Sequence, residues 1–238
     1  GHSPLQFYGA TKVIPRDVRA IYSAHSPFVE ELEWNWGGRR PGLRQRAARF
    51  VARRIEASIC RRADVIQADS NYTIQILDQR YRNVSDRAVV CPGWVDVERF
   101  QPAASRSSVR QELGAPWRDG IPTFLCVRRL ARRMGIDRLI HAARELLDEG
   151  LDFRLLVGGG GSMREELGQL IVDLDLSDHV TMLGRISDEE LPLCYAAADC
   201  FVLPTSGLEC FGLIVLEAFA AGTPVIATPV GAIPEVIG

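Results

Sequence analysis

The chain has 238 residues, of which 47% are hydrophobic and 24% charged, which excludes a disordered or low-complexity chain and favours one or two globular domains. The net charge of −2 gives no basic surplus for wrapping nucleic acid, so we expect no nucleic-acid partner. No apolar run reaches the roughly 18 residues that a membrane-spanning helix needs.

Strand and helix signals alternate through the first half of the chain. Strands are predicted over residues 18–24, 64–68 and 87–91, and helices over 43–62 and 71–82. The first strand ends at His25, and Ser70 is placed to cap the second helix. Residues 101–120 are rich in Ser, Pro and Gly and predict an interdomain linker with a short helix at most.

The second half repeats a strand–helix pattern with short loops. Strands are predicted over 124–127, 153–157, 180–183, 200–203 and 224–228, and helices over 137–149, 163–173, 187–198 and 210–221. Two of these helices begin with capping-box spacing, Ser162 to Glu165 and Ser187 to Glu190. Such alternation predicts right-handed crossovers and a parallel sheet, and uniformly apolar strands indicate helices on both faces. Ligands of such sheets bind beyond the carboxyl ends of the strands.

The six cysteines are scattered along the chain and form no Cys-x-x-Cys pair. This pattern is typical of reduced cysteines in the core of a cytoplasmic protein. We therefore expect neither disulfides nor a zinc site.

Two glutamates bracket the start of the helix predicted over 210–221. Glu209 precedes this helix, and Glu217 lies within its apolar sequence, where a carboxylate is costly unless it is hydrogen-bonded. Between them, the helix start offers free N–H groups at Gly212 and Leu213, which suit an anion. One interpretation is a sugar-nucleotide site; the other is a solvent-facing glutamate and a capping glutamate. The residues alone leave both open.

Two further strand ends carry unusual residues. Arg128, Arg129, Arg132 and Arg133 follow one strand and could neutralise a pyrophosphate or form a solvated loop. The glycine run 158–161 permits close backbone approach, but it lacks the G-x-G-x-x-G spacing of a dinucleotide site.

Taken in order, these segments resemble the retaining, sugar-nucleotide-dependent glycosyltransferases of family 4, which have the GT-B fold. The resemblance runs from about Asp64 to Gly238 and rests on six motifs. They are the strand ending in Ser over 63–70, the "PNGVD…RF"-like segment 91–100, the "GRL…KG"-like loop 127–135, the "lvGxG" strand end 155–160, the E-x7-E motif 209–217 and Gly-Thr-Pro-Val over 222–225.

The resemblance implies roles for the residues of the E-x7-E motif. Glu209 matches the glutamate that contacts the donor sugar, and Glu217 matches the glutamate that binds the ribose hydroxyls. Gly212 and Leu213 match the amides that hold the distal phosphate.

The resemblance also implies roles at the other strand ends. Arg129 matches the phosphate-binding arginine, and the glycines 158–160 match the donor-binding strand end. The family's lysine falls at Met134, so either Arg133 supplies that charge or the phosphate site is weakened. His25 resembles the histidine on the acceptor side.

These motifs predict an α/β protein of GT-B architecture with two Rossmann-like domains, 1–100 on the acceptor side and 121–238 on the donor side. The resemblance also leads us to expect a chain truncated at both ends, with an incomplete first domain, a second domain that lacks its C-terminal helices, and no activity in this fragment alone.

The implied reaction transfers a sugar from a nucleotide diphosphate sugar to a glycan, lipid or small-molecule acceptor with retained anomeric configuration. We expect no metal, because arginines and helix amides would meet the phosphate charge, and no cofactor is implied. The resemblance is consistent with a cytoplasmic enzyme that can contact the inner face of a membrane. Two alternatives stay open: a GT-B sugar-nucleotide epimerase, and an inactive donor-binding module.

Overall fold

The computed structural model describes residues 3–36 and 41–238, which form two compact units. The first unit contains the chain up to Gly93 together with residues 208–212 and 230–238, and the second contains residues 94–207 and 213–229. The units thus differ from the expected boundaries in two respects. The segment 94–120 belongs to the second unit, and two short segments near the C-terminus belong to the first.

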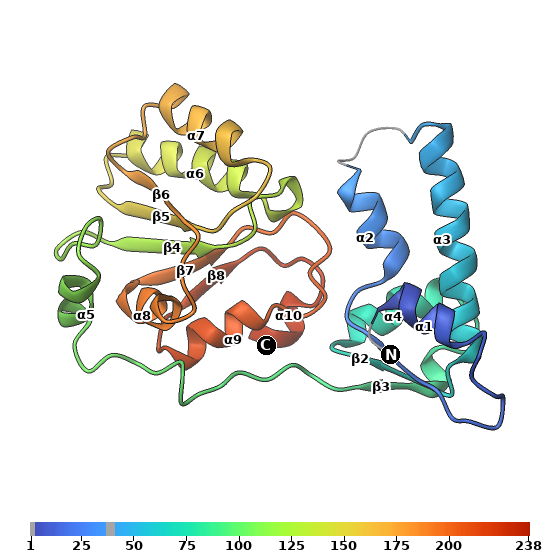
Figure 1. The fold of residues 1–238 in the computed structure, drawn as a ribbon. Coiled ribbons are helices and arrows are strands. Elements are labelled where there is room, and N and C mark those ends of the chain that lie inside the picture. Colours follow the sequence, from blue (N-terminus) through green and yellow to red (C-terminus); the bar gives the residue numbers. More distant parts are fainter. Residues whose placement is uncertain (1–2, 37–40) are drawn as a thin grey trace. The chain divides into compact units, whose positions relative to one another are not determined.

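A three-stranded parallel sheet in the order β1-β2-β3 organises the first unit (Figure 1). Its elements are α1 (Pro4–Ala10), β1 (Ile21–Ala24), α2 (Phe28–Asn35), α3 (Leu43–Arg62), β2 (Val65–Ala68), α4 (Asn71–Arg80), the short η1 (Ser85–Arg87), β3 (Ala88–Val90) and α10 (Ile233–Ile237). The three strands and the helix over 43–62 confirm the sequence predictions. The Ser70 hydroxyl caps α4, as expected, by accepting from the Thr73 N–H at 3.2 Å.

Three short helices, α1, α2 and α10, were not predicted from the sequence. They have seven, eight and five residues, too few to show a clear helical period. At α2 a tertiary contact supplies the start, because the buried Glu56 carboxylate accepts from the Phe28 N–H at 2.6 Å and from the Tyr81 hydroxyl at 2.8 Å. Burial raises the pKa of Glu56, although both hydrogen bonds oppose that shift.

The second unit is a five-stranded parallel sheet in the order β6-β5-β4-β7-β8. Its elements are α5 (Arg106–Leu113), β4 (Thr123–Val127), η2 (Arg132–Met134), α6 (Ile136–Asp148), β5 (Arg154–Gly158), α7 (Arg164–Asp173), β6 (Val180–Gly184), α8 (Glu190–Ala197), β7 (Cys200–Leu203), α9 (Leu213–Ala220) and β8 (Val225–Ala227). Helices α6 and α7 lie on one face, and α8 and α9 on the other (Figure 1). The strand order reverses between β4 and β7, and in such sheets ligands bind beyond the strand ends at that reversal.

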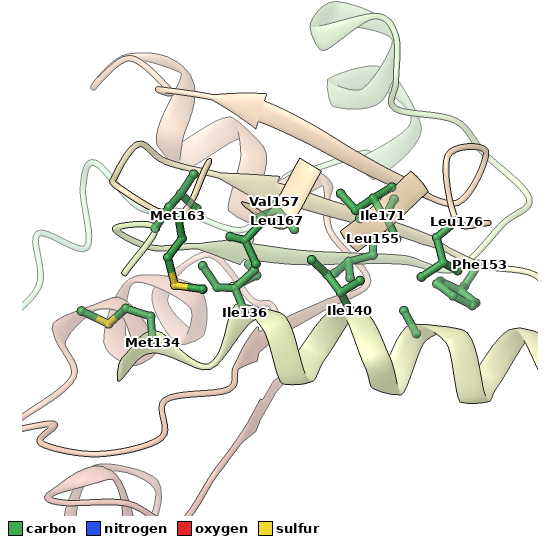
Figure 2. Packing of buried hydrophobic residues seen from close by; sticks show 14 residues of the cluster. Met134, Ile136, Ile140, Phe153, Leu155, Val157, Met163, Leu167, Ile171 and Leu176 are labelled. Atoms are coloured by element: carbon green, nitrogen blue, oxygen red, sulfur yellow. The ribbon is translucent and has the colours of Figure 1, made fainter. Parts of the chain in front are cut away.

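One face of this sheet carries a large apolar core formed by β4, β5, α6 and α7 (Figure 2). Ile136 and Ile140 of α6 pack with Leu167 of α7 over Leu155 of β5. Met134 lies at one end of this cluster and is only 4% exposed. The position that matches the family's lysine is therefore part of the core.

The helix starts of the second unit differ in part from the prediction. Ser187 and Glu190 form the expected reciprocal pair, with contacts of 3.3 and 3.1 Å between each backbone N–H and the other side chain. The prediction of a capping box from Ser162 to Glu165 was wrong, because α7 begins after Met163 without a side-chain cap. The helix predicted from residue 210 begins at Leu213, because Gly212 has a positive φ of 92°.

Among the described residues, no helix is both long enough and apolar enough to cross a membrane. The longest helix, α3, has 20 residues and is rich in arginine.

Candidate functional site

The loops that follow β4 and β7 meet where the strand order reverses. A Cβ on Gly135, whose φ is 69°, would lie 2.0 Å from the carbonyl oxygen of Pro204. The Ser206 N–H donates to the Arg133 carbonyl at 2.8 Å. Backbone contact therefore fixes the arginine-rich loop against the loop after β7, at the edge where a ligand of this fold binds.

The glycine run after β5 is shaped by the same arginine-rich loop. Arg128 N–H donates to the Gly158 carbonyl at 3.0 Å, and Leu130 N–H donates to the Gly160 carbonyl at 2.9 Å. A Cβ on Gly159, whose φ is 126°, would lie 1.9 Å from the Arg128 oxygen. Gly158 is buried against Ile186, whereas a Cβ on Gly160 would meet nothing within 4 Å. Gly158 and Gly159 thus allow the loops to pack, and only Gly160 faces open space.

Glu217 of α9 forms a polar pair with a tyrosine that the sequence analysis missed. The Tyr195 hydroxyl donates to Glu217 Oε2 at 2.9 Å, and the tyrosine is fully buried. Burial raises the pKa of Glu217, while the Tyr195 hydrogen bond and the charge of Arg99 oppose the shift. The carboxylate is therefore held in place and partly withdrawn from water. The available signal was one hydroxyl-bearing aromatic among the residues of α8 that follow Glu190, all of which are otherwise apolar.

The four arginines after β4 have different surroundings. Arg128 Nη2 lies 2.8 Å from the Met134 sulfur. Burial raises the pKa of Tyr195, and the positive charge of Arg128 opposes this shift. Arg129 is exposed and Arg133 is partly buried. Arg132 pairs with both oxygens of Glu166 at 2.9 and 3.0 Å, so its charge is already compensated by a carboxylate. The Arg128 guanidinium thus contacts the residue at the position of the family's lysine.

Helix α9 begins at the edge that carries these loops. Gly212 is buried, and the side chain of Leu213 is 46% exposed. Since the first N–H groups of a helix have no partner within it, the start of α9 can hold an anion.

In the first unit, His25 and Asp69 follow the ends of two paired strands. Ala24 of β1 is in register with Ala68 of β2, which places the next residues side by side. His25 Nδ1 lies 2.9 Å from Asp69 Oδ2. The sequence analysis singled out His25 and missed Asp69, because the two are joined only by the pairing of strands 44 residues apart.

Glu209 belongs to the first unit, in the short segment 208–212. Its carbonyl accepts from the Ala232 N–H at 2.8 Å, and a Cβ on Gly231 would lie 2.1 Å from the same oxygen. The Ser70 hydroxyl donates to the Cys210 carbonyl at 2.5 Å. The loop that presents Glu209 is therefore fixed through its backbone.

Comparison with known families identifies the class of protein. Residues 111–238 match the family described as glycosyl transferases group 1, and residues 1–99 match glycosyltransferase family 4. The chain belongs to the group 1 glycosyl transferases, and its fold is that of GT-B enzymes.

Individual relatives agree with this assignment. The GDP-mannose-dependent alpha-(1-6)-phosphatidylinositol monomannoside mannosyltransferase of Mycobacterium tuberculosis is 36% identical over 80% of this chain and 49% of its own length. The D-inositol 3-phosphate glycosyltransferase of Corynebacterium jeikeium is 37% identical over 77% of this chain and 45% of its own. The chain thus spans about half the length of these curated relatives.

Solved structures show the same fold. Sucrose-phosphate synthase from Thermosynechococcus elongatus matches the whole chain and 57% of its own with a TM-score of 0.81 and 25% identity. Anabaena HepE, solved in complex with UDP, matches 99% of this chain and 60% of its own with a TM-score of 0.78 and 21% identity.

Proposed function

We propose that the protein to which this chain belongs transfers a hexose from a nucleoside diphosphate sugar to an acceptor hydroxyl with retained anomeric configuration. The observation that carries this proposal is the Glu217–Tyr195 pair, on a helix that starts beside cationic loops at the strand-order reversal of a group 1 glycosyl transferase. Two of the relatives above are named for GDP-mannose and for D-inositol 3-phosphate, so these are the first donor and acceptor class to test.

The described residues suggest how the donor would bind. Glu217 would accept from the ribose hydroxyls, because Tyr195 fixes its carboxylate. The N–H groups at the start of α9, from Gly212 and Leu213, would bind the distal phosphate together with Arg129. Either Arg133, which the sequence analysis named, or Arg128, which lies against Met134, would supply the charge of the family's lysine.

The donor sugar and the acceptor involve three other residues. We assign Glu209 to the sugar and the open side of Gly160 to close approach of the donor. His25 belongs to the acceptor side, where Asp69 fixes the orientation of its imidazole ring. Since no carboxylate nucleophile is assigned, we propose that the acceptor attacks on the face from which the phosphate leaves, with the phosphate charge stabilised by arginines and amides. We further propose a cytoplasmic location with peripheral contact to the inner face of a membrane, and no metal or cofactor.

A substitution at Glu217 tests the donor site. Glu217→Gln is expected to weaken nucleoside diphosphate binding by about 1.5–3 kcal/mol, or roughly 10- to 150-fold, because a charge-assisted hydrogen bond to ribose is lost. Calorimetric titration with GDP, UDP, GDP-mannose and UDP-glucose measures the effect and ranks the donors. Leu216→Met is the matched control on the same helix. Equal affinity of the Gln variant and the wild-type chain for all four ligands would remove the ribose assignment.

The raised pKa of Glu217 adds a pH dependence to this test. Its folded pKa lies above that of an exposed glutamate, so the carboxylate form reduces stability above that pKa, and the reduction disappears as the pH falls through it. Ligand affinity should change in the opposite sense, because binding needs the charged form. We expect wild-type affinity to fall on acidification before exposed glutamates titrate, and the Gln variant to lack this step and to unfold at an equal or higher temperature near neutral pH.

The arginine assignments predict a difference between neighbours. The double variant Arg128→Gln, Arg129→Gln should remove most of the preference for nucleoside diphosphate over nucleoside, because it lacks the two guanidiniums that we assign to the phosphates. Arg132→Gln loses one charge from the same loop, but that charge is paired with Glu166, so binding should change less than twofold. Competition binding of GDP against guanosine measures both. A similar loss in both variants would indicate general charge attraction instead of a built phosphate site.

Transfer assays separate this function from its alternatives. Transfer of mannose or glucose to an inositol acceptor supports the proposal, and donor epimerisation without an acceptor supports the epimerase. Nucleotide binding without either reaction supports an inactive donor-binding module, for which the lysine position occupied by Met134 is the specific observation.

A further inference from the structure

A basic groove in the first unit is lined by none of the residues assigned above. It runs between the C-terminal half of α3 and the end of α4 and has a volume of about 520 Å³. Five arginines line it: Arg53, Arg54, Arg61, Arg80 and Arg82. Helix α3 ends before β2 begins, and α4 ends before β3 begins, so this groove lies at the amino edge of the sheet. His25 and Asp69 follow the carboxyl edge of the same sheet.

Most of the positive charge in this groove is uncompensated. Arg80 pairs with Glu30 at 2.6 Å, and its Nη1 atom is buried without a hydrogen-bond partner among the described residues. Burial raises the pKa of the Glu30 carboxyl, and the charges of Arg80 and Arg53 oppose this shift. Arg53 nevertheless makes no ion pair, and Arg54, Arg61 and Arg82 make no ion pair with any carboxylate in the parts of the chain that the structure describes. All four are exposed. Guanidiniums gathered without counter-charges repel one another, so an anion that enters the groove lowers this electrostatic cost.

The groove also has an aromatic wall. Phe50 is 64% exposed, and the Arg54 guanidinium lies 5.8 Å from the centre of its ring. Tyr81 lines the opposite part of the groove, and its hydroxyl is bonded to the buried Glu56. This bond fixes the end of α4 against α3, so the arginines of the two helices are held in one place.

A second basic groove on the same unit provides a contrast. It is lined by Lys12, Arg16, Arg61 and Arg62 together with two hydroxyl side chains. There Arg62 donates to the carbonyls of Pro15 and Val18, and Lys12 lies 4.5 Å from the Tyr8 ring centre. Lys12 and Arg62 thus contact neighbouring segments, whereas Arg53, Arg54 and Arg82 of the groove between α3 and α4 make no hydrogen bond or ion pair with another described segment.

We propose that the groove between α3 and α4 binds phosphate groups, and that it is an anion site separate from the proposed donor site. Arginine matches phosphate oxygens with paired N–H donors, and several guanidiniums on two helices suit more than one phosphate charge. A soluble phosphorylated molecule and the headgroups of an anionic lipid offer the same chemistry, and the experiment distinguishes them.

The test uses two double variants of the full chain. Arg53→Gln, Arg54→Gln removes two groove charges, and Arg44→Gln, Arg46→Gln removes two exposed charges from the same helix outside the groove. Glutamine keeps the helix propensity, and thermal unfolding of each variant confirms that it folds. Inorganic pyrophosphate is titrated by calorimetry, and binding to vesicles of phosphatidylglycerol with phosphatidylcholine is measured by flotation, with phosphatidylcholine alone as the neutral surface.

The expected result is at least tenfold weaker binding by the groove variant and less than twofold change in the control. Loss for pyrophosphate alone identifies a soluble ligand, and loss for anionic vesicles alone identifies a lipid headgroup. Equal losses in both variants, unchanged binding in the groove variant, or no binding of either probe by the wild-type chain would each overturn the proposal. Because Glu217 and Arg129 are intact in both variants, failure here leaves the donor-site tests unaffected.

Discussion

Gly159→Ala is expected to destabilise the second unit by roughly 3 kcal/mol or more and to abolish nucleotide binding. A side chain at φ 126° adopts a backbone conformation that costs about 1–3 kcal/mol outside glycine. Its Cβ would also lie 1.9 Å from the Arg128 carbonyl oxygen, so the loops after β4 and β5 must separate. That separation displaces Arg128 and Arg129, the cations assigned to the donor phosphates.

The neighbouring glycine supplies the control. A Cβ on Gly160 meets nothing within 4 Å, so Gly160→Ala should change stability by no more than about 0.5 kcal/mol. If Gly160 faces the donor, this variant should still weaken binding of the intact nucleotide sugar. Thermal unfolding and GDP titration of both variants measure the difference. Equal stability of the two would show that the loops after β4 and β5 do not need close contact.

Arg110→Met is expected to destabilise the second unit by about 1.5–3 kcal/mol, because it removes a charge-assisted hydrogen bond to the partly buried Asp199 and a hydrogen bond to the Ala197 carbonyl. Arg110 is 7% exposed at its side chain and donates to Asp199 at 2.7 Å and to the Ala197 carbonyl at 2.9 Å. Without it, the Asp199 carboxylate keeps two donors among the described residues, the Thr123 N–H and the exposed Arg106, and the Ala197 carbonyl loses the Arg110 donor.

Arg106→Met is the matched control, since Arg106 pairs with the same carboxylate but is 41% exposed. Its expected cost is about 0.2–1 kcal/mol, as for other surface ion pairs. Urea unfolding followed by tryptophan fluorescence compares the two. A smaller effect of Arg110→Met than of Arg106→Met would contradict the role given to burial.

The Arg110–Asp199 pair also shows what the prediction of a linker over residues 101–120 missed. In the sequence, the segment is polar and rich in turn formers, and a single arginine there resembles a solvated residue. Its partner, Asp199, lies 89 residues further along the chain. Only the folded structure brings them together and makes α5 part of the second unit.

Regular elements were predictable where the hydrophobic pattern is long or the strand is short and apolar. Helix α3 and strand β7 have the predicted bounds, because their sequences show a clear period or a clear apolar run. The short helix α2 depends on the Glu56 carboxylate, which comes from another helix, and no local pattern shows it. The start of α9 moved to Leu213 because Gly212 has a positive φ.

The candidate site was predictable in the same partial way. Single residues at strand ends, such as His25 and Glu217, were found because their chemistry is unusual for their surroundings. Their partners, Asp69 and Tyr195, were missed because pairing across strands and between helices joins residues 44 and 22 positions apart. The glycines after β5 look alike in the sequence, but some allow the loops to pack and one faces open space. Only their φ angles and neighbouring atoms distinguish these roles.

The path of the chain has a consequence for the order in which the protein can assemble. The sheet of the first unit uses residues 21–90, which leave the ribosome early. Its remaining contacts come much later: Ser70 bonds to Cys210, and Glu235 accepts from the N–H groups of Asn71 and Tyr72 at the start of α4, across 140 to 164 positions. Because the whole second unit lies between α4 and Glu235, the first N–H groups of α4 stay exposed while that unit is synthesised. The first unit can therefore be completed only after the second unit has been synthesised, even though its sheet precedes that unit in the chain.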